Sequence, residues 1–117
     1  MKLLLLTACA LAAILSSKVE WLSATEYDFG DLPQGVPATA DFPFRNISGD
    51  VLTIDNVRTA CSCTTPDWSE QIVFPGDSST IRITYDARKT GYFRKKITVF
   101  FTGQRQSEKL YISGYVE

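Results

Sequence analysis

The chain has 117 residues, of which 44 % are hydrophobic and 21 % charged, and its formal net charge is −1. This length suits one domain that buries roughly two thirds of its unfolded surface, and the charge argues against a protein built mainly to bind nucleic acid. Because the sequence contains no histidine, Ser-His-Asp and Cys-His mechanisms are excluded, and most hydrolases with them.

The first seventeen residues have the composition of an export signal. Lys2 is followed by an apolar run from Leu3 to Leu15 and then by two serines, the order found in secretory signal peptides. The run is too short to span a bilayer as an ordinary transmembrane helix. We therefore expect residues 1–17 to be a signal peptide or, alternatively, an uncleaved N-terminal anchor, and the protein to be exported to the periplasm or the cell surface.

Cys9 is a candidate for lipidation. It ends the motif LTAC, which resembles the lipobox of bacterial lipoproteins, in which the cysteine becomes the lipidated first residue. Its position is awkward, because six apolar residues follow it where a polar tether is expected. Two hypotheses stay open: Cys9 is lipidated, or it is a bystander inside the signal. Membrane contact is expected only through this N-terminal segment, if it is uncleaved or lipidated.

Residues 18–25 are expected to be a linker, and the chain from residue 26 has the period-two pattern of β-strands. Tyr27 and Phe29 form a short first strand, and a second strand covers residues 38–44. Pro43 lies inside this second strand and has no N–H to donate. The strand is therefore expected at a sheet edge or at a bulge.

Four further runs alternate between apolar and polar residues. In residues 52–57 the alternation slips near Asp55, which predicts a β-bulge. Residues 80–86 alternate regularly, whereas in residues 93–102 Lys95 falls on the apolar face. The last run covers residues 110–116. The apolar faces contain Leu52, Ile54 and Val57; Ile81, Ile83 and Tyr85; Phe93, Ile97, Val99 and Phe101; and Leu110, Ile112 and Val116.

Gly, Pro, Asn and Asp clusters separate these runs, as expected for turns. Short strands at this spacing, with no amphipathic helical stretch, are typical of an all-β protein. We predict that residues 26–117 form an immunoglobulin-like antiparallel β-sandwich of about seven strands. A small barrel is the alternative.

Cys61 and Cys63 are the only cysteines outside the leader. In an extended strand their Cα atoms would lie about 6.6 Å apart, at the far end of the range for a disulfide, so a bond needs a turn or bulge. Three hypotheses stay open: a local disulfide or buried thiol pair, a redox site helped by Arg58, or a Cu(I) site. Tetrahedral zinc needs more ligands than one chain offers. No catalytic residue, metal site or cofactor is predicted.

Two other groups of side chains are candidates for binding. The basic group is Arg88, Lys89, Arg94, Lys95 and Lys96. It either faces a polyanion or keeps an outer strand face soluble and blocks edge pairing. The aromatic group is Phe100, Tyr111 and Tyr115, and it either forms an exposed patch for a partner or glycan or is covered.

Three stretches resemble the bacterial DUF1573 family: YDFGDLPQG at 27–35, the segment ending in RTACSCTTPDW at 42–68, and FPGDSSTIRITYDARKTGYFRKKITVFF at 74–101. The family consists of predicted exported or lipoprotein-type domains, similar to immunoglobulin-like modules of the major sperm protein and ASPM-SPD-2-Hydin type. The resemblance implies this fold and export, but no activity. Ser62 stands where the family often has glycine.

We therefore predict a non-catalytic interaction or structural module of the bacterial cell envelope. Its expected partner is another envelope protein or a glycan, bound by strand addition at an edge or through a sheet face. No nucleic acid is expected, and the oligomeric state is left open. The alternative is a thiol redox or Cu(I)-handling protein that uses Cys61 and Cys63.

Overall fold

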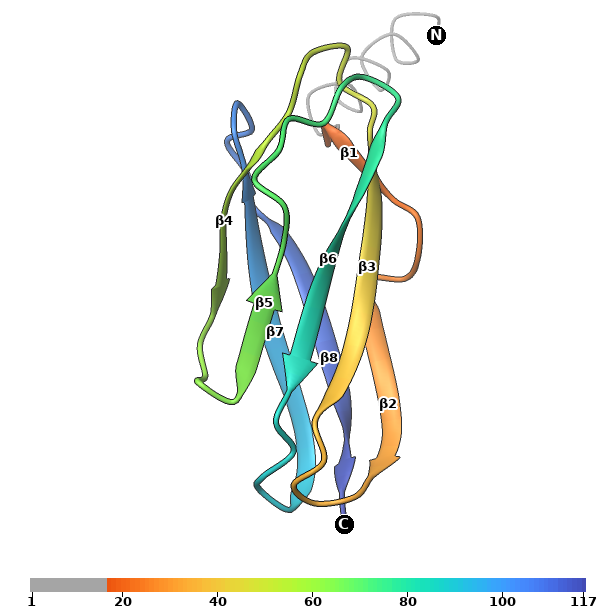
Figure 1. Cartoon of the computed structure of the whole chain (residues 1–117), viewed down its shortest axis with the longest axis vertical. Helices are drawn as coiled ribbons and strands as arrows, with labels where there is room; N and C mark the ends of the chain where they lie inside the picture. Colours follow the sequence, from red (N-terminus) through yellow and green to blue (C-terminus); the bar gives the residue numbers. More distant parts are fainter. Residues whose placement is uncertain (1–16) are drawn as a thin grey trace, which may run out of the picture.

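Two four-stranded β-sheets packed face to face make up the computed structural model (Figure 1). The structure describes residues 17–117, so Cys9 and nearly all of the expected signal or anchor lie outside the described residues. Within residues 17–117 no helix has the length and apolarity needed to cross a membrane. The described strands are β1 (Val19–Trp21), β2 (Glu26–Leu32), β3 (Ala38–Asn46), β4 (Ile54–Thr59), β5 (Thr64–Asp67), β6 (Ser78–Tyr85), β7 (Gly91–Phe101) and β8 (Glu108–Val116).

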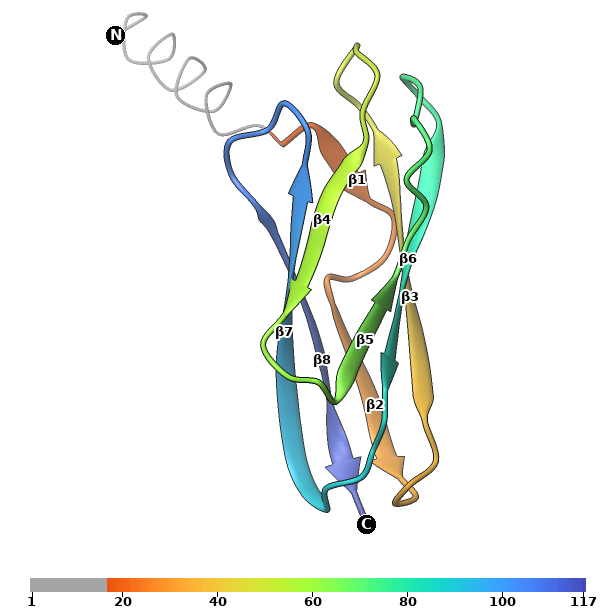
Figure 2. The same ribbon diagram turned by 60° about the vertical axis from the view of Figure 1, so that its left-hand side comes forward.

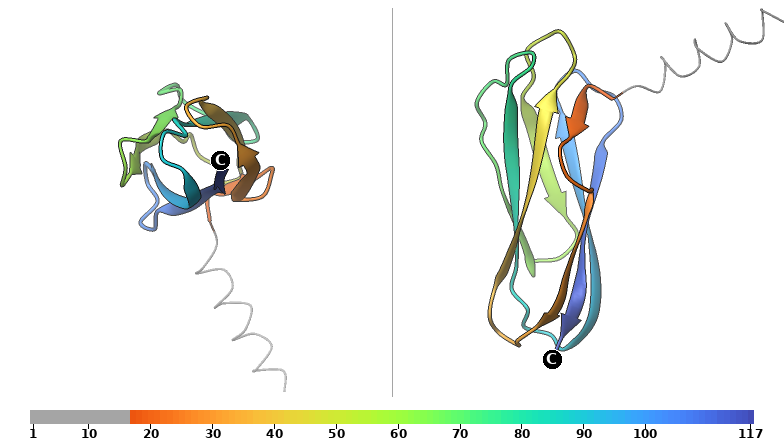
Figure 3. Two further views of the ribbon diagram at one scale, coloured as in Figure 1. Left: turned by 90° about the horizontal axis from the view of Figure 1, so that it is seen from below. Right: turned by 90° about the vertical axis from the view of Figure 1, so that its right-hand side faces the viewer.

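The strand order matches a constant-type immunoglobulin sandwich whose first strand is shared between the sheets. One sheet has the order β1-β3-β6-β5 and the other β2-β8-β7-β4. β1 pairs antiparallel with β3, whereas β2 crosses to the second sheet and runs parallel to β8. Figure 3 shows the two layers from below and from the side. The predicted immunoglobulin-like β-sandwich is confirmed, with eight described strands because the first is split.

Strand β1 corrects the expectation that residues 18–25 are only a linker. Val19 is buried, and Trp21 packs with its ring centroid 5.7 Å from that of Phe44 and 6.3 Å from that of Phe101. A three-residue strand is too short to show a periodic pattern. Its place in the sheet comes from pairing with β3, a contact about 25 residues away in sequence.

The core lies between the sheets and uses the apolar faces expected from the alternation. Phe44 is fully buried and meets Phe101 edge to face at 5.1 Å, while Tyr85 stacks on Phe93 at 3.9 Å. Such aromatic contacts add to the free energy gained by burying the rings. The largest fully buried side chains are Phe42, Phe44, Asn46, Leu52, Ile81, Ile83, Ile97, Val99, Leu110, Ile112 and Val116.

Of the two predicted strand irregularities, the bulge near residue 55 is confirmed, whereas the prediction for β3 is wrong. β3 lies between β1 and β6, and its register with β6 has no bulge. Pro43 lies where β1 ends, and its carbonyl accepts the N–H of Leu22 at 2.9 Å. The missing N–H of Pro43 therefore faces the end of β1 rather than a ladder partner. In β4 the register against β7 shifts between Ile54 and Asn56, which is the bulge expected near residue 55.

Candidate functional site

The two cysteines lie in the connection that carries the chain from one sheet to the other (Figure 2). β4 is an edge strand of one sheet and β5 an edge strand of the other. Between them the N–H of Thr64 donates to the carbonyl of Cys61 at 3.2 Å, closing a turn. The turn brings the Cα atoms of Cys61 and Cys63 to 5.1 Å, and a disulfide joins the residues.

Backbone contacts hold this turn against the body of the domain. Cys63 packs on the core, and its carbonyl accepts the N–H of Asp86 at 2.9 Å. The hydroxyl of Thr59 donates to the carbonyl of Thr64 at 3.1 Å. Arg58, considered as a cation for a thiolate, lies instead over Phe100, 5.5 Å from the ring centroid. These contacts fix the connection between the two sheets to the body of the domain.

No group of three or more His, Cys, Asp or Glu side chains within residues 17–117 is placed to hold a metal ion. The cysteine pair alone offers two sulfur atoms, and both take part in the disulfide. Soft metals such as Cu(I) bind thiolates, and these form only after reduction of the bond.

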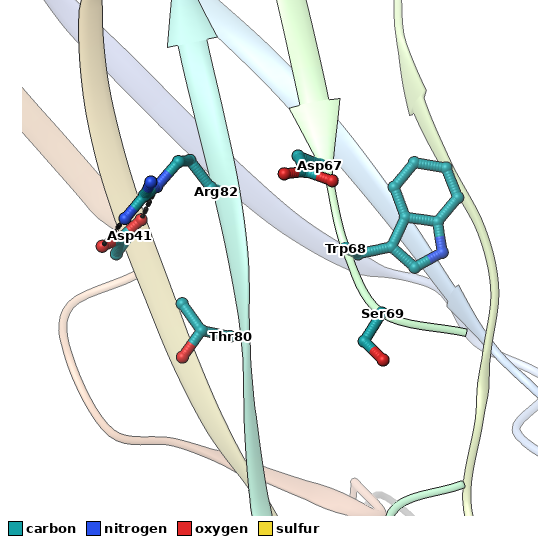
Figure 4. A pocket seen from close by; sticks show the side chains of 6 residues that line it. All are labelled: Asp41, Asp67, Trp68, Ser69, Thr80 and Arg82. Carbon is teal, nitrogen blue, oxygen red and sulfur yellow. Dashed lines mark hydrogen bonds and ion pairs between the residues drawn. The ribbon is translucent and has the colours of Figure 1, made fainter. Parts of the chain in front are cut away.

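A shallow hollow of about 370 Å³ lies on the outer side of β3, β6 and the end of β5 (Figure 4). Arg82 turns toward Asp41 and donates two hydrogen bonds to its carboxylate, at 2.9 and 3.2 Å. These bonds lower the pKa of Asp41 and raise the pKa of Arg82 from their ordinary values. The lining residues are Asp41, Asp67, Trp68, Ser69, Thr80 and Arg82.

Trp68 is the one aromatic residue among the described residues that line this hollow. Its ring packs against the core, and its indole Nε1 is buried without a hydrogen-bond partner. Sequence reasoning did not find the hollow, because its residues come from three strands. The one available signal was that Asp41 and Arg82 both fall on the polar face of an alternating run.

The outer face of the β2-β8-β7-β4 sheet carries the aromatic group. Tyr92 and Tyr115 are register partners on β7 and β8, with 72 % and 50 % of their surface exposed. Tyr111 is partly covered, because the guanidinium carbon of Arg94 lies 3.9 Å from its ring centroid. That guanidinium also donates to Glu26 at 2.9 Å, which raises the pKa of Arg94. The exposed patch is therefore centred on Tyr92 and Tyr115.

The basic group proposed from the sequence does not form one surface. Arg88 pairs with Asp86 at 3.8 Å in the turn before β7. Arg94 and Lys96 point outward from β7, whereas Lys95 is half-buried on the side facing the core. Because successive residues of a strand point to opposite faces, a run of three cations is divided between them.

Two of the four described edge strands, β5 and β4, are poorly suited to pairing with another strand. β5 has only four residues and contains Pro66, and β4 carries the bulge near residue 55. Short strands, prolines and bulges are devices that prevent edge-to-edge pairing. The outer faces are therefore the better candidates for contact with a partner.

This strand order, with its first strand shared by both sheets, defines an immunoglobulin-like β-sandwich domain. The chain belongs to the DUF1573 family, described as a protein of unknown function, whose family model matches residues 20–116. The family suggested by the sequence motifs is thus confirmed. No curated protein matches the sequence.

Solved structures with this fold come from very different organisms. A protein of unknown function from Porphyromonas gingivalis W83 is similar with a TM-score of 0.71 and 19 % identity, over 87 % of this chain and 50 % of that one. The PapD-like domain 7 of human CEP192 gives 0.72 and 11 %, over 87 % of both chains. The Vibrio cholerae VesB protease gives 0.67 and 12 %, over 86 % of this chain and 32 % of that one.

These similarities concern the fold alone, because the identities are low. The chain spans half of the Porphyromonas protein and about a third of the Vibrio protease. The same sandwich therefore occurs both as most of a solved chain and as one part of a larger protein.

Proposed function

We propose that this protein is a non-catalytic interaction module of the bacterial cell envelope, and that it contacts its partner through the outer face of the β2-β8-β7-β4 sheet. The carrying observation is the exposed cross-strand pair Tyr92 and Tyr115. Tyrosine supplies a large apolar ring with a polar tip, which suits contact with another envelope protein or a glycan.

Contact through the face is favoured over strand addition. The short, proline-containing β5 and the bulged β4 offer few continuous backbone groups to an added strand. The sheet face, in contrast, presents rings and charged groups from several strands. Arg94, held by Glu26 and stacked on Tyr111, would add a fixed cation beside the tyrosine pair.

The alternative role, thiol redox chemistry or Cu(I) handling, receives no support from the comparisons. It requires a free, exposed thiolate. Cys61 and Cys63 are both half-buried and bonded to each other. We therefore treat the pair as a structural element of the crossover.

The proposal is tested by placing a photoreactive amino acid at Tyr115 and illuminating intact cells. We expect a cross-linked product of defined mass, which is lost when Tyr92→Arg is added. A glycan partner would instead give products of heterogeneous mass that glycosidases shorten. The matched control carries the same amino acid at Thr39, an exposed residue of β3 on the other sheet. Equal cross-linking at both positions, or none at Tyr115, would contradict the proposal.

A further inference from the structure

Four apolar side chains are exposed at one end of the sandwich, in the loops after β3 and before β6. Between 53 % and 57 % of the surface of each is exposed. Isolated exposed apolar residues are common, but a group on adjoining loops marks a contact surface. The four residues, which we call the apolar end, are Ile47, Val51, Ile72 and Phe74.

A short bridge sets the direction of three of these side chains. The N–H and carbonyl groups of Leu52 and Val73 exchange hydrogen bonds of 3.0 and 2.7 Å. Leu52 and Val73 are buried. Since side chains alternate along an extended segment, Val51, Ile72 and Phe74 project to the opposite, outer side. The bridge therefore presents three apolar groups together.

Asn46 holds the same two loops together from inside. Its side chain is fully buried, and its Nδ2 donates to the carbonyls of Asp50 at 2.7 Å and Val73 at 2.9 Å. Its Oδ1 accepts the N–H and the hydroxyl of Ser48. The loops are thus held in a fixed arrangement, so the apolar end is a built surface rather than a pair of loose loops.

The described chain begins at this end. The N–H of Ile47 donates to the carbonyl of Lys18 at 3.0 Å, and Lys18 N–H donates to Gln104 in the β7–β8 turn. Only three peptide steps separate Lys18 from Leu15, the last residue of the apolar run in the sequence. Even a fully extended chain covers about 11 Å in three residues. A bilayer that held Leu15 would therefore lie within that distance of Lys18, whose carbonyl is bonded to Ile47.

We propose that Leu3–Leu15 is retained as an anchor in one leaflet of a bilayer, and that the apolar end docks on the surface of the same leaflet. Val51, Ile72 and Phe74 then enter the interfacial layer, where apolar side chains gain from leaving water. The outer sheet face proposed for partner binding remains in water, so this inference is independent of that function.

The charges near the apolar end indicate which lipids it accepts. Asp50 and Asp77 are exposed in the same two loops, and carboxylates are repelled by anionic lipid. We therefore expect docking on zwitterionic phosphatidylcholine, with no gain from added phosphatidylglycerol. A polybasic contact would show the opposite lipid preference.

The test uses the full chain reconstituted in phosphatidylcholine vesicles whose acyl chains are brominated, since bromine quenches nearby tryptophan fluorescence. Phe74→Trp places a reporter in the apolar end. Tyr92→Trp is the matched control. Residue 92 lies near the start of β7, nine residues and about 30 Å from the other end of that strand. Trp21 and Trp68 give the same background in both variants.

We expect the added emission of Phe74→Trp to fall, as for a side chain buried about 5–10 Å into the boundary between headgroups and acyl chains, and that of Tyr92→Trp to stay unchanged. Adding Ile72→Asp to Phe74→Trp should remove the quenching. Equal quenching of the two reporters by brominated lipid overturns the docking. A blue shift of Phe74→Trp that grows with protein concentration without lipid overturns it in favour of a second copy. An intact mass of the native protein that lacks residues 1–17 overturns the anchor.

Discussion

Arg82 and Asp41 are direct register partners on β6 and β3, and the guanidinium holds the carboxylate by two hydrogen bonds of 2.9 and 3.2 Å. Both side chains are about half exposed. Water and salt therefore screen the pair, and its contribution to stability is small. The two residues nevertheless line one side of the hollow on this sheet, and their bidentate hydrogen bonds fix the direction of both side chains.

This pair makes folding stability depend on pH at the acid end. The pKa of Asp41 is lower in the folded protein, so its contribution is present above the ordinary aspartate pKa and is lost as the pH falls through the lowered value. Asp41→Asn should remove this part of the pH dependence, and added salt should weaken it. Urea unfolding between acid and neutral pH measures the effect. In a double-mutant cycle with Arg82→Gln, additive losses would show that the pair does not interact.

Phe44 should be among the most sensitive core positions. It is fully buried between Trp21 and Phe101. Phe44→Ala removes the ring and leaves a cavity, which typically costs about 3–5 kcal/mol of unfolding free energy. Phe74→Ala is the control, because that ring is 57 % exposed and its loss should change stability by less than about 0.5 kcal/mol. Comparable losses in chemical denaturation would show that the sheets do not enclose Phe44.

Gly114 allows a close approach between three strands. A Cβ at this position would lie 2.9 Å from the carbonyl oxygen of Gly30 on β2 and 3.0 Å from the Phe93 ring on β7. Gly114→Ala is therefore expected to lower the unfolding free energy by about 1–3 kcal/mol. Adding Phe93→Leu should recover part of the loss if the ring is the obstacle. A Gly114→Ala variant with wild-type stability would mean that β2 is not held against β8.

The disulfide turn should stabilise the crossover modestly. The bond between Cys61 and Cys63 closes a very small loop, so the chain-entropy model assigns it about 1–2 kcal/mol. Cys61→Ser with Cys63→Ser should fold, lose about that much stability by the same model and keep its partner. Thermal unfolding with and without reductant measures the change. A variant that keeps its stability but loses cross-linking at Tyr115 would point to the thiol hypothesis instead.

Asn46 should be costly to replace although it is polar. Asn46→Ala removes the two amide hydrogen bonds to the carbonyls of Asp50 and Val73, and each such bond contributes about 0.5–1.5 kcal/mol. Hydrogen exchange should also become faster at Leu52 and Val73, because the bridge between the two loops loses its support. Ser48→Ala, which removes one hydroxyl bond to Asn46, is the milder control. Unchanged exchange in Asn46→Ala would contradict this role.

The cysteine turn shows which features can be predicted from residues that are close together in the sequence. The spacing of Cys61 and Cys63 required a turn for a disulfide, and the bulge near Asp55 followed from a slip in the alternation. Arg58 was proposed as a neighbour of the thiols because it is close in sequence. In the fold it points along the outer face toward Phe100, since its place on β4 and not its sequence distance decides what it meets.

Alternation and turn residues were enough to predict the all-β class, the inward faces and the bulge in β4, because they depend on neighbours along the chain. Other features depend on pairings between segments that are distant in sequence. These features are strand β1, the Asp41–Arg82 pair, the Tyr92–Tyr115 pair and the apolar end. A period of two tells which face of its own strand a side chain occupies. Which strand lies beside it, and in which register, is settled only when the sheets pack around a common core.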